Sequence, residues 1–227
     1  MAFHLSDVVP WGRAFREYQA MFALTDSDLR KNILGCGDGP ASFNSEATRL
    51  GIRVTSADPI YQFSVEDIRA RIDETAPVIA KQLTDNSDEF VWSYFPNVDV
   101  VIEDRLRAMQ LFLTDYSKGV KEGRYIQASL PQLPFRDREF DLSLCSHFLF
   151  LYSQQHDLGF HLCAINELCR VSSEVRIFPL MELGSVPSRH LEEVVSHLRE
   201  IGYTVNRVKI AYEFQKGADE MLCIRAA

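Results

Sequence analysis

The sequence of 227 residues has no long hydrophobic run and no cluster of lysines and arginines. Its most apolar window, residues 140–152, is too short to cross a bilayer, so we expect no membrane partner. The start lacks the basic flank and apolar stretch of a signal peptide. The 32 acidic residues outnumber the 24 basic ones and give a net charge of −8, which disfavours tight binding to a phosphate backbone. We therefore expect no nucleic acid as a main partner.

Closely spaced cysteine pairs are also missing. The five cysteines stand at positions 36, 145, 163, 169 and 223 and form no C-x-x-C motif. An odd number cannot close into a full set of disulfides, which favours a reducing compartment. Cys163 and Cys169, with His161 on the same expected helix, lack the spacing of metal ligands, and we expect them to be small buried thiols. These observations predict a cytoplasmic protein without a metal site.

Short apolar runs, typical of buried parallel strands, alternate with helical stretches along the chain. A further pair of strand-like runs near the end flanks Gly217, which suits a hairpin turn, so we expect this pair to be antiparallel. The pattern predicts one α/β domain over residues 1–227, with helices on both faces of a mostly parallel sheet. The expected strands are residues 32–36, 52–57, 124–128, 140–147, 174–180, 203–214 and 220–225.

Two segments break the alternation. The N-terminal segment, residues 1–30, has apolar residues at the spacing of a short amphipathic helix and is expected to pack as a lid or brace. Residues 60–123 predict two helices with a break at 85–88, and Ser64 with Asp67 is a plausible cap of the first. A crossover between neighbouring parallel strands needs only a dozen or more residues, so we expect a helical insert that roofs the sheet.

Glycines at 35, 37 and 39 follow the first expected strand and precede a helix expected at 42–50. Alternate glycines let the backbone approach a ligand closely at the carboxyl edge of a sheet, where open α/β sheets bind nucleotides. The string is equally compatible with a tight turn that binds nothing.

The second expected strand ends in Asp58 and Pro59. A carboxylate at this place can accept both hydroxyl donors of a ribose, although an Asp-Pro pair also commonly starts a turn. The GxGxxG fingerprint fails because Pro40 and Ser42 stand where its last glycine belongs, and no GxxxxGK[ST] loop is present. The sequence therefore favours a nucleoside cofactor and disfavours a dinucleotide or a P-loop nucleotide.

Two further strings occur later in the chain, Leu133-Pro134-Phe135-Arg136-Asp137-Arg138-Glu139-Phe140-Asp141-Leu142 and Glu167-Leu168-Cys169-Arg170-Val171. With these strings, the glycine-rich motif 33–41 and Asp58, residues 30–58 and 124–225 resemble the class I S-adenosylmethionine-dependent methyltransferases, in particular the branch that methylates small molecules. The resemblance implies a Rossmann-like, doubly wound, seven-stranded sheet with an antiparallel C-terminal strand, S-adenosylmethionine as cofactor, and a small-molecule acceptor.

The resemblance also implies which residues hold the cofactor. The chain departs from the family at Gly35, which stands where an acidic residue helps to hold the amino-acid end of the cofactor, a task that the N-terminal segment can take over. At Ser129 many members carry an Asp that bonds the adenine amino group, and a serine hydroxyl can still accept one hydrogen bond. The expected cofactor-binding residues are Gly35, Cys36, Gly37, Gly39, Asp58, Pro59, Ser129, Leu130 and Ser146.

His147 follows the fourth expected strand, at the edge where the reactive methyl group should lie. Imidazole titrates near neutrality and can take a proton from a hydroxyl or amine nucleophile, although a lone histidine is more often structural. Tyr18, Tyr61 and Tyr152 are more simply explained as packed aromatics with satisfied hydroxyls. We expect a methyltransferase that is a monomer or homodimer. The alternatives are a protein that binds S-adenosylmethionine without catalysis and, least favoured, a dehydrogenase.

Overall fold

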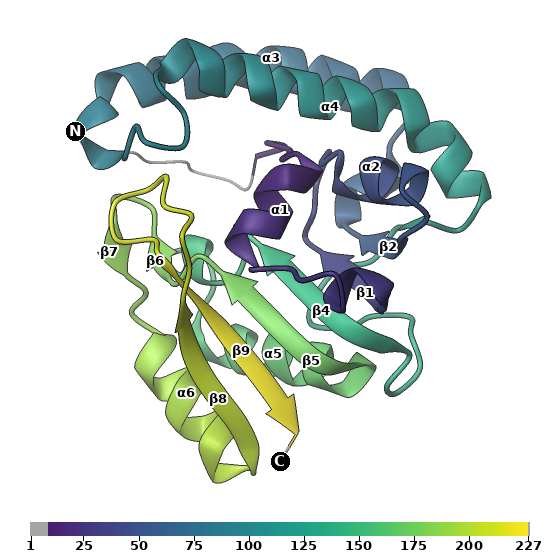
Figure 1. The fold of residues 1–227 in the computed structure, drawn as a ribbon, viewed down its shortest axis with the longest axis vertical. Coiled ribbons are helices and arrows are strands. Elements are labelled where there is room, and N and C mark those ends of the chain that lie inside the picture. Colours follow the sequence, from purple (N-terminus) through teal and green to yellow (C-terminus); the bar gives the residue numbers. More distant parts are fainter. Residues whose placement is uncertain (1–8, 227) are drawn as a thin grey trace.

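Seven strands form one sheet in a computed structural model that describes residues 9–226 (Figure 1). Their order is β3-β2-β1-β4-β5-β9-β8. Strands β1 to β5 pair in parallel, whereas β9 runs antiparallel to both β5 and β8, which confirms the expected fold class. The strands are β1 Asn32–Cys36, β2 Arg53–Ala57, β3 Tyr125–Ile126, β4 Phe140–Ser146, β5 Ser172–Phe178, β8 Tyr203–Lys209 and β9 Glu220–Ala226.

Adjacent residues of the central strands are buried because helices cover both faces of the sheet. Ile33 and Leu34 of β1 are both fully buried, as are Leu144 and Cys145 of β4. At the edge, β8 ends well before the expected residue 214, because the chain leaves the sheet there and runs as residues 210–219 to meet the insert. Hydrophobic periodicity alone does not separate a strand from a buried loop of similar composition.

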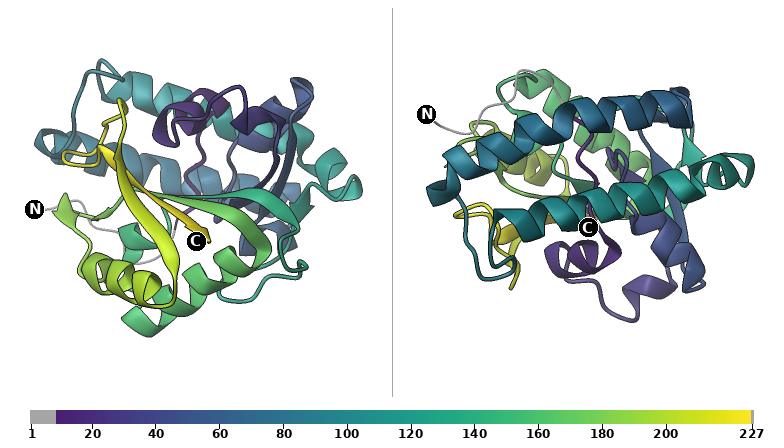
Figure 2. Two further views of the ribbon diagram at one scale, coloured as in Figure 1. Left: turned by 60° about the horizontal axis from the view of Figure 1, so that its bottom comes forward. Right: turned by 90° about the horizontal axis from the view of Figure 1, so that it is seen from above.

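The helices form two groups on opposite sides of the sheet (Figures 1 and 2). Helices α5 and α6 pack on one face in a core with the central strands, and α1 and α2 build a second core on the other face. Helix α6 and the small hairpin of β6 and β7 were not expected from the sequence. The bounds are α1 Phe15–Met21, α2 Phe43–Arg49, α3 Val65–Asp85, α4 Val98–Lys121, α5 Leu158–Val171, α6 Leu191–Glu200, β6 Met181–Glu182 and β7 Val186–Pro187. Short 3₁₀ helices cover Asp28–Arg30, Pro59–Gln62, Ser87–Glu89 and Phe150–Tyr152.

The insert consists of α3 and α4, which lie side by side across the carboxyl end of the sheet (Figures 1 and 2). Ser64 caps α3 by accepting a hydrogen bond from the backbone N–H of Asp67, and α3 ends at Asp85, both as predicted. Ile68 and Ile72 pack on Phe112 of α4 in a third core. The two helices therefore bury one apolar face against each other and the edge of the sheet.

A buried ion pair fastens the insert to the rest of the molecule. Arg105 of α4 forms two hydrogen bonds with Glu17 of α1, one of them 2.7 Å from Nη2 to Oε1. Tyr212, from the segment after β8, donates to the same carboxylate at 3.0 Å. Burial by itself raises the pKa of Glu17, but the charge and hydrogen bonds of Arg105 outweigh it and hold this pKa below its ordinary value. Three segments distant in sequence thus meet at one carboxylate.

Residues 133–142 and 167–171, the two later strings of the family resemblance, contact each other, and the contact stabilises the fold. Glu167 of α5 accepts a hydrogen bond from the backbone N–H of Leu133 (2.7 Å), and Arg170 donates to the carbonyl of Phe135 (2.9 Å). These bonds hold the loop between β3 and β4 against α5. On the same helix Cys163 is exposed, so the expectation of a buried thiol is wrong there, whereas Cys169 is buried. No helix in residues 9–226 combines the length and apolar character that a bilayer crossing needs.

Candidate functional site

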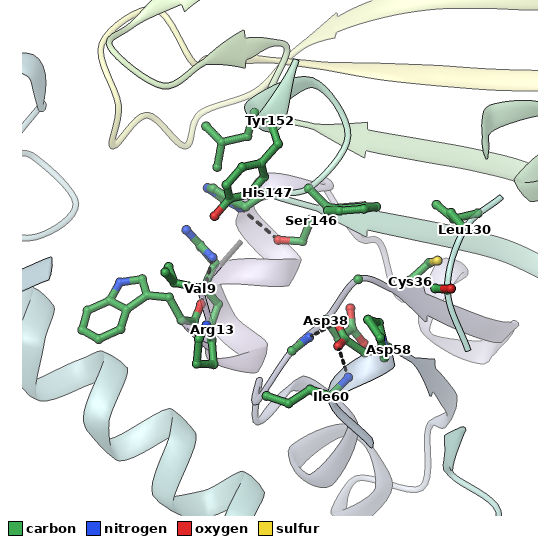
Figure 3. Close-up of a pocket in the computed structure, with 18 of the residues that line it drawn as sticks. Val9, Arg13, Cys36, Asp38, Asp58, Ile60, Leu130, Ser146, His147 and Tyr152 are labelled. Carbon is green, nitrogen blue, oxygen red and sulfur yellow. Dashed lines mark hydrogen bonds between the residues drawn. The ribbon is translucent and has the colours of Figure 1, made fainter. Parts of the chain in front are cut away.

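A cavity of about 900 Å³ lies at the carboxyl edge of the sheet, beneath the insert. The ends of β1, β2 and β4 and the segment before α1 contribute to its walls (Figure 3), and so does α3. Gly35 is the one expected site residue that does not line it. The other expected site residues all do: Cys36, Gly37, Gly39, Asp58, Pro59, Ser129, Leu130, Ser146 and His147.

The glycine loop after β1 owes its path to backbone conformations that favour glycine. Gly37 has φ +72° and Gly39 has φ +55°. A Cβ on Gly37 would lie 3.1 Å from the Cβ of Phe148, so the loop also passes close to the segment after β4. The backbone N–H of Gly37 donates to the carbonyl of Ala57 (2.9 Å), which draws the loop toward the end of β2.

Asp58 joins the glycine loop to the turn after β2. Its Oδ2 accepts from the backbone N–H of Gly39 and its Oδ1 from that of Ile60, each at 2.8 Å. Burial raises the pKa of Asp58 to about 6, a rise that the two hydrogen bonds limit. Asp58 is thus a turn residue, and it also faces the cavity with acceptor capacity to spare on both oxygens.

Asp38, which sequence reasoning missed, lies beside Asp58 (Figure 3). Its carboxylate accepts from the hydroxyls of Tyr18 (2.7 Å) and Ser56 (2.6 Å). A Cβ on Gly35 would fall 1.9 Å from Oδ2 of Asp38, so this carboxylate fills the space that a side chain at position 35 would need. The carboxylate of Asp38, from the glycine loop itself, therefore lies where the family's acidic side chain at position 35 would be. The available signal was an Asp between two glycines.

Two buried carboxylates at one edge affect each other's titration. Burial raises the pKa of Asp38 to about 7, and the negative charge of Asp58 adds to the rise, while the hydrogen bonds from Ser56 and Tyr18 oppose it. The neutral and ionised forms of Asp38 are therefore both populated near neutral pH.

Arg13, also missed, brings a positive charge to the cavity wall from the segment before α1. Its Nη1 donates to the carbonyl of Trp11 (3.1 Å), and its Nε has no hydrogen-bond partner among the described residues. Burial lowers the pKa of Arg13 to about 10, with Arg105 contributing, so the guanidinium stays charged at neutral pH. Arg13 lies on the same side of the cavity as His147 (Figure 3). No pattern in the sequence singled out this arginine.

His147 adopts a left-handed backbone conformation, φ +50°, which is uncommon for a residue other than glycine and typical of functional sites. Its backbone N–H donates to the carbonyl of Phe178 (2.6 Å), and its Nδ1 is 3.0 Å from Oγ of Ser146. Burial lowers the pKa of His147 well below its ordinary value, and the charges of Arg13 and Arg105 lower it further. The imidazole is therefore neutral near neutral pH, and its lowered pKa makes it a weaker base than a free imidazole.

The three tyrosines expected to be packed aromatics are all buried. Tyr18 donates to Asp38, and Tyr61 donates to the carbonyl of Gly39 (2.9 Å), so both hydroxyls are satisfied within the protein. Tyr152 lines the cavity near His147 (Figure 3). Residues 9–226 contain no group of three or more His, Cys, Asp or Glu side chains that could hold a metal ion.

Comparisons with known proteins give one relative in sequence and a broader likeness in fold. No family model matches the chain. It is 35% identical over 223 residues, 98% of either chain, to the "Uncharacterized protein MJ0045" of Methanocaldococcus jannaschii. Its fold resembles the mitomycin 7-O-methyltransferase MmcR, with a TM-score of 0.50, 13% identity, and coverage of 94% of this chain and 54% of that one. It likewise resembles the PH0226 protein of Pyrococcus horikoshii OT3, with a TM-score of 0.50, 10% identity, and coverage of 93% and 90%. The chain thus has the fold of the class I S-adenosylmethionine-dependent methyltransferases, and it belongs to one family with the M. jannaschii protein MJ0045.

Proposed function

We propose that the protein transfers a methyl group from S-adenosylmethionine to a small-molecule acceptor within this cavity. The observation that carries the proposal is the position of Asp58, whose carboxylate faces the cavity beside the glycine loop at the carboxyl edge of the sheet. Open α/β sheets bind nucleosides at this edge, with an acidic residue on the ribose. A small acceptor is favoured over a nucleic acid because the net charge is −8 and the site is a cavity beneath α3.

The residues present fit the parts of the cofactor. Both oxygens of Asp58 can accept a further hydrogen bond, as two ribose hydroxyls require. Ser129 and Leu130 would contact the base, and the Arg13 guanidinium would pair with the carboxylate of the amino-acid end. The chain lacks the family's acidic residues at positions 35 and 129, and their absence favours a protein without catalysis. Asp38 replaces them in part, because it supplies a carboxylate at the glycine loop.

When bound, the cofactor supplies an electrophilic methyl group on a sulfonium. Transfer of this group to an O–H or N–H acceptor would leave the cofactor as its neutral thioether, S-adenosylhomocysteine, and would release one proton from the acceptor. The chain's contribution is to hold the two reactants in line and to exclude water, which lowers the barrier by fixing their orientation. His147 is the group that we assign to the released proton, as a weak base because burial lowers its pKa, and Ser146 would orient its ring through Nδ1.

Calorimetric titration tests the cofactor site directly. We expect S-adenosylhomocysteine and S-adenosylmethionine to bind and to raise the melting temperature, whereas NAD should not. Transfer of a labelled methyl group to a panel of phenols, amines, thiols and carboxylic acids then tests catalysis. Binding without transfer to any class would favour the alternative function, a protein that binds the cofactor without catalysis. Absence of binding at millimolar ligand would overturn the proposal.

A further inference from the structure

The cavity continues beyond the cofactor-binding residues into a region that we call the distal chamber. Five residues define its wall, and all are hydrocarbon side chains without a polar atom. They come from α3, from the connection between α3 and α4, from the β6–β7 turn, and from the segment between β8 and β9. The five are Ile79, Leu83, Phe90, Leu183 and Phe214.

The chamber lies at the far end of α3 from the nucleoside site. Ile68, near the start of α3, and Leu83, near its end, both line the cavity. At 1.5 Å per residue these positions are about 22 Å apart along the helix axis. The cavity of about 900 Å³ is near the upper end of the range for small-molecule sites. Its length and volume leave room for a second molecule beside a nucleoside cofactor.

The chamber wall is held in place by contacts between distant segments. The rings of Phe90 and Phe214 stack with their centroids 4.8 Å apart and an interplanar angle of 26°. The backbone N–H of Val91 donates to the carbonyl of Phe214 (2.7 Å), and that of Lys216 donates to the carbonyl of Glu89 (3.0 Å). The insert and the C-terminal segment therefore form this wall together. Such a preformed wall costs a ligand little ordering on binding.

Polar groups that can meet a ligand lie where the chamber joins the rest of the cavity. His147 and Arg13 line that part, and the neutral imidazole of His147 can accept a hydrogen bond. At the opposite end Glu89 and Gln215 line the cavity, and Gln215 is already engaged, since its Nε2 donates to the carbonyl of Glu182 (2.6 Å). A chamber walled by hydrocarbon offers water few partners and gains free energy when an apolar group fills it.

We infer that the methyl acceptor is amphipathic, with a hydroxyl-bearing or similar nucleophilic head beside His147 and an elongated hydrocarbon body in the distal chamber. This inference rests on the proposed function, because it assigns the head to the place where the methyl group arrives. The body makes no specific polar contact, so the site selects it by length and width.

A series of 4-alkylphenols, from ethyl to nonyl, serves as the set of test ligands. Each is titrated calorimetrically into the full chain saturated with S-adenosylhomocysteine, which blocks the nucleoside site. We expect affinity to rise about threefold to fourfold per added methylene until the chamber is filled, and to stay level for longer chains. Affinity independent of chain length would overturn the inference.

Shortening the chamber provides the second measurement. Leu83→Phe should move the levelling point to a shorter alkyl chain, and Ile79→Phe is the substitute if that variant does not fold. The matched control is Leu106→Phe on α4, at a side chain that is 41% exposed, which should leave the levelling point unchanged. An unchanged levelling point in folded Leu83→Phe and Ile79→Phe would overturn the inference. Titration of S-adenosylhomocysteine alone separates the two proposals. If S-adenosylhomocysteine does not bind, the proposed function is wrong, and the phenol series titrated into the ligand-free protein still tests the chamber.

Discussion

The two ends of the cavity are built in different ways. The end beside the glycine loop, which we call the nucleoside end because the proposed cofactor would bind there, consists of backbone amides and the carboxylates of Asp38 and Asp58. These groups follow β1 and β2, which are neighbours in the sheet and close in sequence. The distal chamber consists of side chains from four segments scattered between residues 79 and 214. The first is therefore a property of the sheet, whereas the second depends on where the insert docks. Under the proposed function, substitutions in the chamber should change the preferred acceptor without altering the cofactor site.

The largest expected effect comes from releasing the insert. Arg105→Met leaves the carboxylate of Glu17 buried without its cation, which should cost about 3–5 kcal/mol of unfolding free energy. Urea unfolding measures this loss, and phenol binding should fall together with stability. Lys118→Ala on the same helix is the control, since Lys118 pairs with Glu122 in solvent and should change stability by less than about 0.5 kcal/mol. A loss below about 1 kcal/mol in Arg105→Met would show that the insert docks without this pair.

The next effect is a pH dependence at the nucleoside end. The folded pKa of Asp38, about 7, lies above the ordinary aspartate value. Its contribution to stability is therefore fully present below about pH 4 and is lost as the pH rises through 7. We expect the ligand-free protein to lose roughly 2–4 kcal/mol of unfolding free energy over this span through Asp38.

Asp38→Asn is the comparison that isolates this group. The amide keeps the volume and an oxygen acceptor but cannot ionise, so the variant should show a flatter pH profile than the wild type. Denaturant melts at several pH values provide the measurement. Parallel profiles for the two proteins would assign the pH dependence to other groups.

Asp58→Ala should separate the two ends of the cavity. Loss of a charged hydrogen-bond acceptor is expected to weaken S-adenosylhomocysteine binding by about 1.5–3 kcal/mol and to leave phenol binding unchanged. Because Asp58 also accepts from the N–H groups of Gly39 and Ile60, the melting temperature should fall modestly. Asp58→Asn, which retains an acceptor oxygen for one of these bonds, should lose less stability. Equal cofactor affinity in wild type and Asp58→Ala would reduce Asp58 to a turn residue.

The smallest effect concerns the motion of the insert. Segments that open for substrate come from the less stable parts of a fold, so hydrogen exchange in residues 60–123 should slow on addition of S-adenosylhomocysteine more than in 203–225. The buried pair of Arg105 and Glu17 holds α4, so we expect the change to be larger in α3. Equal slowing of hydrogen exchange in both segments would show that the insert is a static brace.

Much of the sheet and the nucleoside end could be predicted because their signals are local. Buried parallel strands are short apolar runs, and the glycine loop and Asp58 occur within one strand–turn–helix–strand stretch. Residues 133–142, the most family-specific string, predicted the fold but no residue of the cavity. Glu167 and Arg170 bind the loop that contains Leu133, and none of these residues lines the cavity.

The sequence by itself determined the positions of the hydrophobic runs that form strands, the capped helices of the insert and the carboxylate at the end of β2. Periodicity shows that a helix has an apolar face but does not show which surface that face meets. Only the tertiary structure decided that Asp38 fills the space at Gly35, that Arg13 and His147 share one side of the cavity, and that Phe90 stacks on Phe214. These meetings depend on packing and a buried ion pair between residues far apart in the chain, for which no local pattern exists.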